Sequence, residues 1–459
     1  MLPSEVKEYL ETHRQEHLER LSTLLRFPSI SSQDNHNVDC LACAEYLVDY
    51  LQRLGFSTRL ESWKKHPIIL ARSSDDIAPA DAPTILVYAH YDVQPPDPVE
   101  LWTNPPFEPT IRDGSIYARG AADDKGLLLA TVHAAEAFVR TIGKLPLNIL
   151  FFFEGDEETG SPGLEEFVSD FAEELRADYA LVVDLGFFAP GVPTVITALR
   201  GLIYLEMKLD GPAHDLHSGE HGGAVVNPIN ALARIIAQMH DEQGRVTLPG
   251  FYDDVAEPSE QELTDWQRLP FSEEEYAKRV GVEPVGGEKG RTVLERIWSR
   301  PTLDCNGIIG GYHGPGAKTV LPAWASSKIS MRLVPNQLPE KVIEAFDQFV
   351  ASHCPAGVKA SINVTSQSRP LLIRPDNPAV GAVRKALEEA FSAKAMLTRA
   401  GGSVPVAEMI QRIIKVEPVV TGFMLPDNNI HAPDEHFQLE QYYKGTIAMA
   451  AMFQNFSKL

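Results

Sequence analysis

Residues 147–158 read LNILFFFEGDEE, an apolar run that ends in four acidic side chains. The same pattern occurs in TILVYAHYD at 84–92 and in YALVVD at 179–184, where histidine or aspartate follows the apolar residues. Strands that are buried on both faces of a parallel sheet read as unbroken apolar runs. Polar sites of such sheets gather outside the carboxyl ends of the strands. The three stretches therefore predict parallel strands that carry their polar residues to one common edge.

Most of the chain predicts an α/β fold with a mainly parallel sheet. Helix and strand patterns alternate over about the first 195 residues, as expected for βα units. Helices are indicated at about residues 38–54 and from Lys125 onward, between the apolar strands. The alternation returns from about residue 373, with a helical pattern in NPAVGAVRKALEEAF, a strand pattern in EPVVTGFM and a C-terminal helical pattern.

A different pattern separates these two parts. In GLIYLEMKLD at 201–210, apolar and polar residues alternate, which is typical of a half-exposed antiparallel strand. The segments that follow predict the order β-α-β-β-α-β of a small split-βαβ, or ferredoxin-like, sheet. We therefore expect a main domain of residues 1–199 and 373–459 that is interrupted by a smaller α+β domain of residues 200–372. Residues 244–300 are polar and look like an excursion within the smaller domain.

The composition excludes some classes of partner. The chain has 63 acidic and 41 basic residues, so its net charge is −22, whereas nucleic acids and anionic membranes attract basic surfaces. No stretch approaches the ~18 apolar residues of a membrane span, and residues 1–25 predict an amphipathic helix rather than a signal peptide. The four cysteines include a lone C-x-x-C, Cys40 and Cys43, which we interpret as a buried pair rather than a redox or zinc site. We expect a cytoplasmic protein.

His90 and Asp92 lie two residues apart at the end of a predicted strand. Alternate residues of a strand point the same way, so Asp92 can accept a hydrogen bond from one ring nitrogen of His90. This would fix the tautomer and leave the other nitrogen free for a metal ion. The alternative is a strand-end pair that caps a turn, and H-x-D by itself does not exclude it.

The turn ARGAADDKG at 118–126 carries two adjacent carboxylates, Asp123 and Asp124. Adjacent carboxylates repel each other unless a cation or hydrogen bonds stabilise them. One alternative is that an aspartate accepts backbone N–H groups at the start of the helix that follows. We expect both roles, with Asp124 as the helix cap and Asp123 as the metal ligand.

Further candidate ligands follow the other strands. In the pair Glu157 and Glu158, one carboxylate can bind a metal while the other accepts a proton from the water that the metal activates. Asp184 ends its strand in the same way, and His431 in PDNNIHAPDEHF adds a second imidazole, for which His436 is a weaker substitute. A solvated acidic loop, a turn aspartate and a surface histidine are the alternatives. Histidine and carboxylate together favour Zn²⁺ or Mn²⁺ and predict a two-metal pocket.

The motifs, in their order, resemble one family. They are YAHYDVQP (88–95), ARGAADDKG (118–126), EGDEETGS (154–161), HSGEHGG (217–223), SMRLVPNQ (330–337) and NIHAPDE (429–435). This set is similar to that of the two-zinc metallopeptidases, which include carnosinase-like cytosolic dipeptidases, carboxypeptidase G-like enzymes, aminoacylases and acetylornithine or succinyl-diaminopimelate deacylases. The resemblance implies a dimetal catalytic domain and a second domain that serves as lid and forms a homodimer.

The resemblance also implies roles for single residues. The implied metal ligands are His90, Asp123, Glu158, Asp184 and His431. Asp123 would bridge two ions, with His90 and Asp184 on one and Glu158 and His431 on the other. Asp92 would orient His90.

Four further residues and a general base are implied on the same grounds. Glu157 would be the base, and His217 would cross to the partner subunit and stabilise the oxyanion. Arg332 would bind the carboxylate of the substrate, and Thr319 and Ser403 would contact the substrate.

The activity implied is hydrolysis of the amide bond of dipeptides or short peptides by a water shared between two metals. In this family, Asp at the position of Asp184 tends to go with dipeptidases and aminopeptidases, and Glu with carboxypeptidases and deacylases. TRAGGSVP at 398–405 also resembles the dipeptidase loop TREGGSIP. Ala400 departs from that loop, where related enzymes carry Glu. An N-acyl amino acid deacylase or carboxypeptidase on the same scaffold therefore stays an alternative, as does a metal- or peptide-binding protein without turnover.

Overall fold

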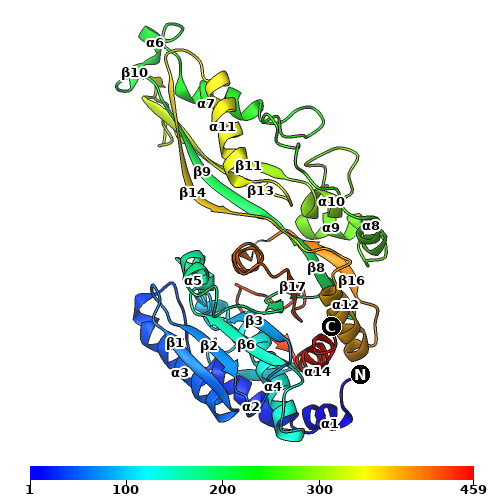
Figure 1. The fold of residues 1–459 in the computed structure, drawn as a ribbon. Coiled ribbons are helices and arrows are strands. Elements are labelled where there is room, and N and C mark those ends of the chain that lie inside the picture. Colours follow the sequence, from blue (N-terminus) through cyan, green and yellow to red (C-terminus); the bar gives the residue numbers. More distant parts are fainter. Residues whose placement is uncertain (403) are drawn as a thin grey trace.

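The computed structural model describes every residue of the chain except Ser403, and its larger sheet has nine strands (Figure 1). The strand order is β1-β2-β6-β3-β7-β17-β8-β15, and β16 pairs with β8. The central strands β6, β3, β7 and β17 run parallel, as the apolar runs predict. The bounds are β1 (Phe56–Glu61), β2 (Ile68–Ser73), β3 (Thr84–His90), β6 (Asn148–Glu154), β7 (Tyr179–Val183), β8 (Thr194–Leu199), β15 (Leu371–Leu372), β16 (Met396–Ala400) and β17 (Pro418–Thr421).

Helices cover this sheet and bury its apolar faces. The helix α4 (Lys125–Thr141) contacts β3 and is itself covered by α1 (Ser4–Thr12), α2 (Arg14–Leu25) and α14 (Leu439–Phe456). Its residues 125–138 are all buried, in keeping with the near-continuous apolar sequence. Four further helices contribute to the same core, namely α3 (Asn37–Arg53), α5 (Leu164–Asp170), α12 (Pro378–Phe391) and α13 (Pro405–Met409).

The smaller sheet has the order β11-β13-β9-β14, and its strands are antiparallel. Burial alternates along β9, so Ile203, Leu205, Met207 and Leu209 form one apolar face, as predicted. The helices α7 and α11 pack on this sheet, which gives the ferredoxin-like order. The predicted α/β class with a smaller α+β sheet is therefore confirmed. The bounds are β9 (Gly201–Asp210), α7 (Pro228–Ala237), β11 (Thr302–Gly310), β13 (Trp324–Leu333), α11 (Pro339–His353) and β14 (Lys359–Ser368).

Two short linkers join the sheets. Arg200 alone separates β8 from β9, and Arg369 and Pro370 separate β14 from β15. The linkers run against each other, because a Cβ added at Gly201 would lie 2.5 Å from the carbonyl oxygen of Ser368. Glycine is required there by the close backbone approach. The exact domain limits at residues 199 and 372 stay a prediction.

The excursion at residues 244–300 contains α8 (Glu260–Trp266), α9 (Glu273–Val280) and α10 (Val293–Trp298). It has a small core of its own, in which Trp266 and Trp298 pack edge to face with ring centroids 5.2 Å apart. α8 and α10 also contact β16 of the larger sheet. The excursion therefore connects the smaller sheet to the edge of the larger one, which its polar sequence did not predict.

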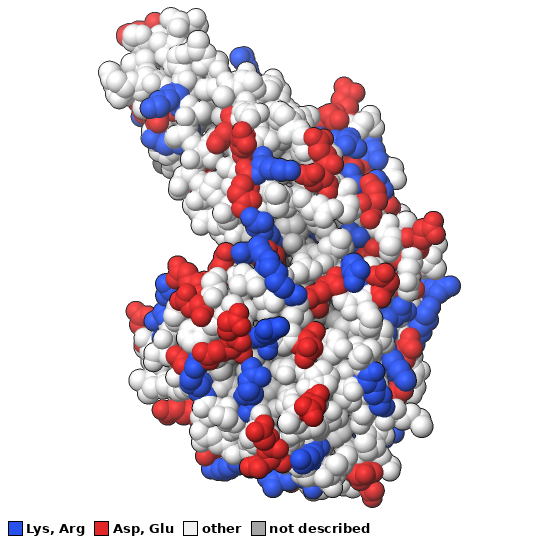
Figure 2. All heavy atoms as spheres, in the orientation of Figure 1, with Lys and Arg blue, Asp and Glu red and all other residues white. Residues whose placement is uncertain are grey.

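Two small sheets complete the described part of the chain. One joins β4 (Thr110–Arg112), β5 (Ser115–Tyr117) and β18 (His436–Gln438), and the other joins β10 (Leu216–His217) and β12 (Val320–Leu321). Figure 2 shows acidic and basic side chains interspersed over one face, without a broad basic area. Among the described helices, none has the length and apolar character that crossing a membrane requires.

Candidate metal centre

The predicted ligands meet at the carboxyl edge of the parallel strands. His90 is the last residue of β3 and lies opposite Glu154, the last residue of β6. Asp184 follows β7 directly, and Glu158 follows β6 in a short 3-10 turn, Glu157–Thr159. The parallel register therefore brings residues that are far apart in sequence to one place, as the apolar strands predict.

Asp123 lies between the two histidines. Its Oδ1 atom is 3.1 Å from Nε2 of His90, and its Oδ2 atom is 3.0 Å from Nε2 of His431. On one side, Nε2 of His90 is also 3.6 Å from Oδ1 of Asp184. On the other side, Nε2 of His431 is 3.3 Å from Oε2 of Glu158. One carboxylate thus faces two separate sets of nitrogen and oxygen atoms.

These atoms form two groups that have the composition of metal sites. In each group, the nitrogen and oxygen atoms lie within 4.8 Å of one another. The first group is His90, Asp124 and Asp184, and the second is Asp123, Glu158 and His431. Imidazole with carboxylates is the donor set that Zn²⁺ accepts, and Mn²⁺ also suits it.

The electrostatics of the centre fit a cation. Burial raises the pKa of Asp184 to about 6 and raises that of Glu157 well above its ordinary value. Hydrogen bonds to Asp123 and Glu158 raise the pKa of His431 to about 10, so this imidazole keeps a proton. The crowded carboxylates thus favour protonated, positively charged histidines. A divalent cation could replace these protons and supply the same positive charge.

Asp124 departs from its predicted role. It occupies the first position before α4, but its side chain makes no capping hydrogen bond. Instead, Oδ2 accepts the backbone N–H of His90 at 3.0 Å. Its buried Oδ1 has no hydrogen-bond partner among the described residues and belongs to the first ligand group. A buried carboxylate oxygen without a partner is costly, and a bound cation would satisfy it.

Asp92 orients both sides of the centre. Its carbonyl oxygen lies 3.1 Å from Nδ1 of His90, and its carboxylate lies 3.4 Å from the same atom. The two carboxylate oxygens accept the backbone N–H groups of Glu157 at 3.2 Å and Glu158 at 3.0 Å. Because Nδ1–H of His90 donates to Asp92, Nε2 is left to face the ligand group.

Glu157 and Arg332 line one cavity of 560 Å³ between the two sheets. Glu157 comes from the turn after β6, and Arg332 comes from β13 of the smaller sheet. Gly402 from the loop after β16 lines the same cavity. The predicted base and the predicted carboxylate-binding residue therefore line one cavity, and Glu157 is the chain neighbour of the candidate ligand Glu158.

The structure does not bring every predicted residue to this place. His217 in β10 is exposed, and its Nδ1 accepts the backbone N–H of Gly219 at 3.0 Å. Thr319 lies beside it, because its carbonyl oxygen accepts the N–H of Ser218 at 3.1 Å. Figure 1 shows β10 at the end of the smaller sheet that is distant from β3 and β6. Ser403 lies outside the described residues.

His436 takes no part in either ligand group. Its ring stacks on Tyr117 at 4.8 Å, and its Nδ1 lies 3.1 Å from the carbonyl oxygen of Asp434. Cys40 and Cys43 are buried in α3, in agreement with the structural interpretation of the C-x-x-C pair.

Sequence reasoning missed two supporting residues. Glu435 is fully buried and accepts the backbone N–H groups of Gly120 and Ala122 at 3.0 Å each. Gln94 donates from Nε2 to Oε2 of Glu158 at 2.8 Å. Both residues lie within stretches that carry the family resemblance, and that position is the signal that could have drawn attention to them.

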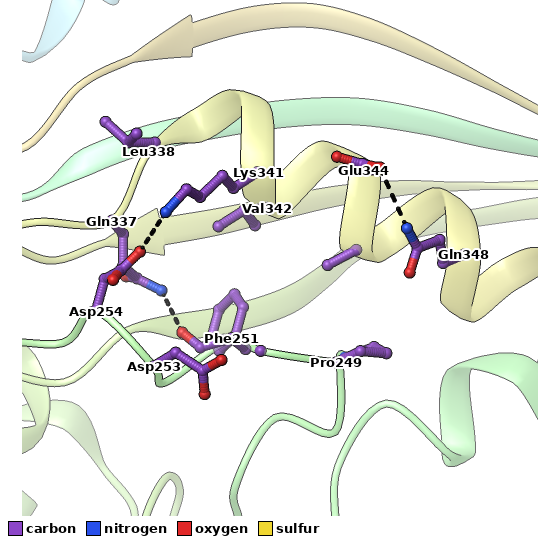
Figure 3. Close-up of a pocket in the computed structure, with 12 residues that line it drawn as sticks. Pro249, Phe251, Asp253, Asp254, Gln337, Leu338, Lys341, Val342, Glu344 and Gln348 are labelled. Atoms are coloured by element: carbon purple, nitrogen blue, oxygen red, sulfur yellow. Dashed lines mark hydrogen bonds and ion pairs between the residues drawn. The ribbon is translucent and has the colours of Figure 1, made fainter.

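A second cavity lies away from the metal ligands. It measures 330 Å³ and is formed by the loop at residues 249–254 and by α11 (Figure 3). Lys341 pairs with Asp254 at 2.9 Å beside it, and Gln337 donates to the carbonyl oxygen of Phe251 at 2.7 Å. None of the residues predicted for the site lines this cavity, so the cavity between the sheets is the candidate for the substrate.

Comparison with known proteins agrees with this geometry. The sequence profile described as Peptidase family M20/M25/M40 matches residues 86–455. A Cys-Gly metallodipeptidase of Candida albicans is 29% identical over 98% of this chain and 96% of its own. The Beta-Ala-His dipeptidase of Homo sapiens is 29% identical over 100% of this chain and 93% of its own. The crystal structure of a metallo-carboxypeptidase from Sulfolobus solfataricus superimposes with a TM-score of 0.84 at 30% identity, covering 97% and 100% of the two chains.

Proposed function

Because the chain belongs to peptidase family M20/M25/M40, we propose that it is a metal-dependent peptidase that hydrolyses the amide bond of dipeptides and short peptides. Two relatives that it matches over nearly the whole chain are named a Cys-Gly metallodipeptidase and a Beta-Ala-His dipeptidase. The observation that carries the proposal is the position of Asp123, whose two carboxylate oxygens face His90 at 3.1 Å and His431 at 3.0 Å.

Two divalent cations are proposed as the cofactor, with Zn²⁺ expected and Mn²⁺ as the alternative. His90 and Asp184 would hold one ion, Glu158 and His431 would hold the other, and Asp123 would bridge them. When bound, the ions would supply Lewis acidity and an acidified water molecule. The unpartnered Oδ1 of Asp124 supports a cation near the first group as well.

Glu157 is the proposed general base. It lies next to the ligand Glu158 in the chain and lines the cavity between the sheets. We propose that its carboxylate takes a proton from the attacking water and delivers that proton to the leaving amine. Burial raises the pKa of Glu157, which brings this carboxylate closer to the range where it can both accept and release a proton.

Arg332 is the proposed anchor for the substrate carboxylate. A guanidinium group can bind a carboxylate through two parallel hydrogen bonds. Arg332 lines the same 560 Å³ cavity as Glu157. Cavities of about 300–1,000 Å³ suit small ligands, so an anchor at one end would limit the length of the peptide.

The protein is further proposed to act in the cytoplasm as a homodimer. His217 and Thr319 lie at the distant end of the smaller sheet, away from the metal ligands of their own chain. A two-fold partner could accept them at its own centre, where the His217 imidazole would stabilise the oxyanion.

A metal-removal assay combined with a substrate panel tests the proposal. Dialysis against a chelator should abolish hydrolysis of free dipeptides, and about two equivalents of Zn²⁺ or Mn²⁺ per chain should restore it. The panel adds N-acetyl amino acids and N-blocked dipeptides. If only the blocked substrates are cleaved, the protein is a deacylase or carboxypeptidase and the dipeptidase proposal is wrong. Metal binding without turnover of any substrate would indicate a binding protein.

A further inference from the structure

The linker residue Arg200 contacts the loop that follows β16. Its Nε atom donates to the carbonyl oxygen of Gly401 at 3.1 Å. Gly401 directly follows the strand, and the next residue, Gly402, lines the cavity with Glu157 and Arg332. A residue that joins the two sheets therefore holds the backbone of a loop in the wall of the substrate cavity.

Gly401 is held tightly at this position. A Cβ added to it would lie 3.0 Å from Nη2 of Arg200 and 3.4 Å from the carbonyl oxygen of Ile297. Ile297 belongs to α10 of the excursion. The glycine thus lies between the linker arginine and the excursion, and a larger residue there would displace one of them.

The strand that leads into the loop is fixed by a buried ion pair. Nε and Nη2 of Arg399 donate to the two carboxylate oxygens of Glu262 at 2.8 and 3.1 Å. Both side chains are almost completely buried, and the Thr197 hydroxyl donates to the same carboxylate at 2.7 Å. Arg399 therefore fixes the end of β16, and Arg200 holds Gly401, the first residue after that strand.

Arg200 also lies near the proposed substrate anchor. Leu202, two residues after Arg200, pairs with Arg332 in the register of β9 and β13. Burial and the charge of Arg332 lower the pKa of Arg200 to about 10, and Asp304 opposes this shift. Of the two arginines, Arg332 lines the cavity, and Arg200 lies behind it in the linker.

We propose that Arg200 is a positioning residue for substrate binding, which fixes the carbonyl group of Gly401 so that Gly402 completes the cavity wall beside Arg332. This inference rests on the proposed function, because it assumes that a substrate with a terminal carboxylate occupies the cavity. Arg200 affects substrate affinity by positioning the loop, and other residues carry out the chemical step.

Kinetics of four variants test the proposal. Arg200→Met removes the donor to Gly401, and KM for a free dipeptide should rise on the order of tenfold, with a much smaller change in kcat. Arg200→Lys keeps the charge without the Nε geometry and should give an intermediate KM. Gly401→Ala should raise KM as well. In the double variant, the fold increase in KM should be smaller than the product of the two single increases. Full additivity, or a KM within twofold of the wild type in Arg200→Met, would overturn the proposal.

A measurement that needs no turnover separates this inference from the proposed function. Amide hydrogen exchange of a peptide covering β16 and Gly401 should be faster in Arg200→Met, with unchanged exchange in β3. Arg374→Met is the matched control, because Arg374 is exposed and its Nε lies 3.6 Å from Glu417. Unchanged exchange around Gly401 would contradict the positioning role, even if the wild-type protein hydrolyses dipeptides. Faster exchange in an enzyme that cleaves no dipeptide would instead contradict the proposed function. If Arg200→Met does not fold, both the kinetics and the hydrogen exchange are measured on Arg200→Lys.

Discussion

The backbone N–H of Asp123 donates to Oε1 of Glu435 at 3.1 Å, although 312 residues separate the two in sequence. The other carboxylate oxygen of Glu435 accepts Nη1 of Arg119 at 2.6 Å, and both side chains of this ion pair are buried. Glu435 therefore determines the shape of the turn that presents Asp123 to the two histidines. Together with the contact between His431 and Asp123 and the hydrogen bond from Nη2 of Arg119 to the carbonyl oxygen of Ala432, this side chain joins the loop that carries His431 to the turn that carries Asp123.

The first prediction concerns Glu435. Glu435→Ala leaves Arg119 as a buried charge without its partner, and this should reduce the free energy of unfolding by about 3–5 kcal/mol. The milder Glu435→Gln should keep the fold and weaken metal binding about 10–100-fold, because the turn that carries Asp123 loses its charged acceptor. Urea unfolding and metal titration of the purified variants measure the two effects.

Glu440→Gln provides the control for Glu435. Its side chain is 60% exposed on α14 and pairs with Arg14 at the surface, so neither unfolding nor metal binding should change. If Glu435→Gln binds metal as tightly as the wild type, the turn does not depend on this carboxylate.

The second prediction separates metal binding from the proton transfer proposed for Glu157. Glu157→Gln keeps the size of the side chain but removes its capacity to accept a proton. The variant should retain both metal ions by elemental analysis, and kcat should fall about 10²–10⁴-fold. Glu165→Gln is the control, because Glu165 also lines the cavity but pairs with Arg412 at 2.9 Å. Full turnover in Glu157→Gln would show that Glu157 is not the general base.

The site at the carboxyl ends of the central strands was predictable, because buried parallel strands have a distinctive composition. Each apolar run that ends in an acid or a histidine is a strand whose carboxyl end lies at the candidate metal centre, as in β3 and β6. The alternation in β9 likewise predicts a strand with one buried face. These features depend on a few neighbouring residues, which a sequence displays directly.

Long-range partners were not predictable in the same way. Asp124 was expected to cap α4, but its carboxylate accepts the backbone N–H of His90, which lies 34 residues earlier. The polar sequence of the excursion does not indicate a structural role, although Glu262 in it binds Arg399 in the larger sheet. A sequence shows that such residues are charged, but the partner of each charge depends on how the chain folds back.

The third prediction is that acid destabilises the protein through a buried histidine. His17 on α2 stacks on His133 of α4 at 4.1 Å, and its Nε2 lies 3.9 Å from Glu136. Burial, together with the charge of Arg20, lowers the pKa of His17 to about 4. An unfolded histidine has a pKa near 6.5, so between these values the unfolded chain binds more protons. Stability should therefore fall as the pH drops from about 6.5 to 4, by roughly 2 kcal/mol at pH 5 from this residue.

Urea unfolding of metal-free protein at pH 7.5 and pH 5.0 measures this effect, since metal binding has its own pH dependence. His17→Gln should lose part of the difference in unfolding free energy between the two pH values, whatever its stability at neutral pH. His240→Gln, an exposed position shortly after α7, should behave as the wild type. An identical pH dependence in His17→Gln and the wild type would show that this imidazole is not the acid-sensitive group.

The last prediction tests whether His217 acts on the partner subunit. His217→Ala should reduce kcat on the order of 10²–10³-fold without loss of metal, because an oxyanion donor is missing. Glu157→Gln homodimers are inactive for a different reason, since each keeps His217 but lacks its own base. If the two variants are mixed and allowed to exchange subunits, each mixed dimer contains one site with both residues intact. Random pairing then gives about a quarter of the wild-type activity, because half of the dimers are mixed and each of these has one working site. If the mixture stays as inactive as its components although exchange is shown by mass spectrometry, His217 serves no active site across the dimer.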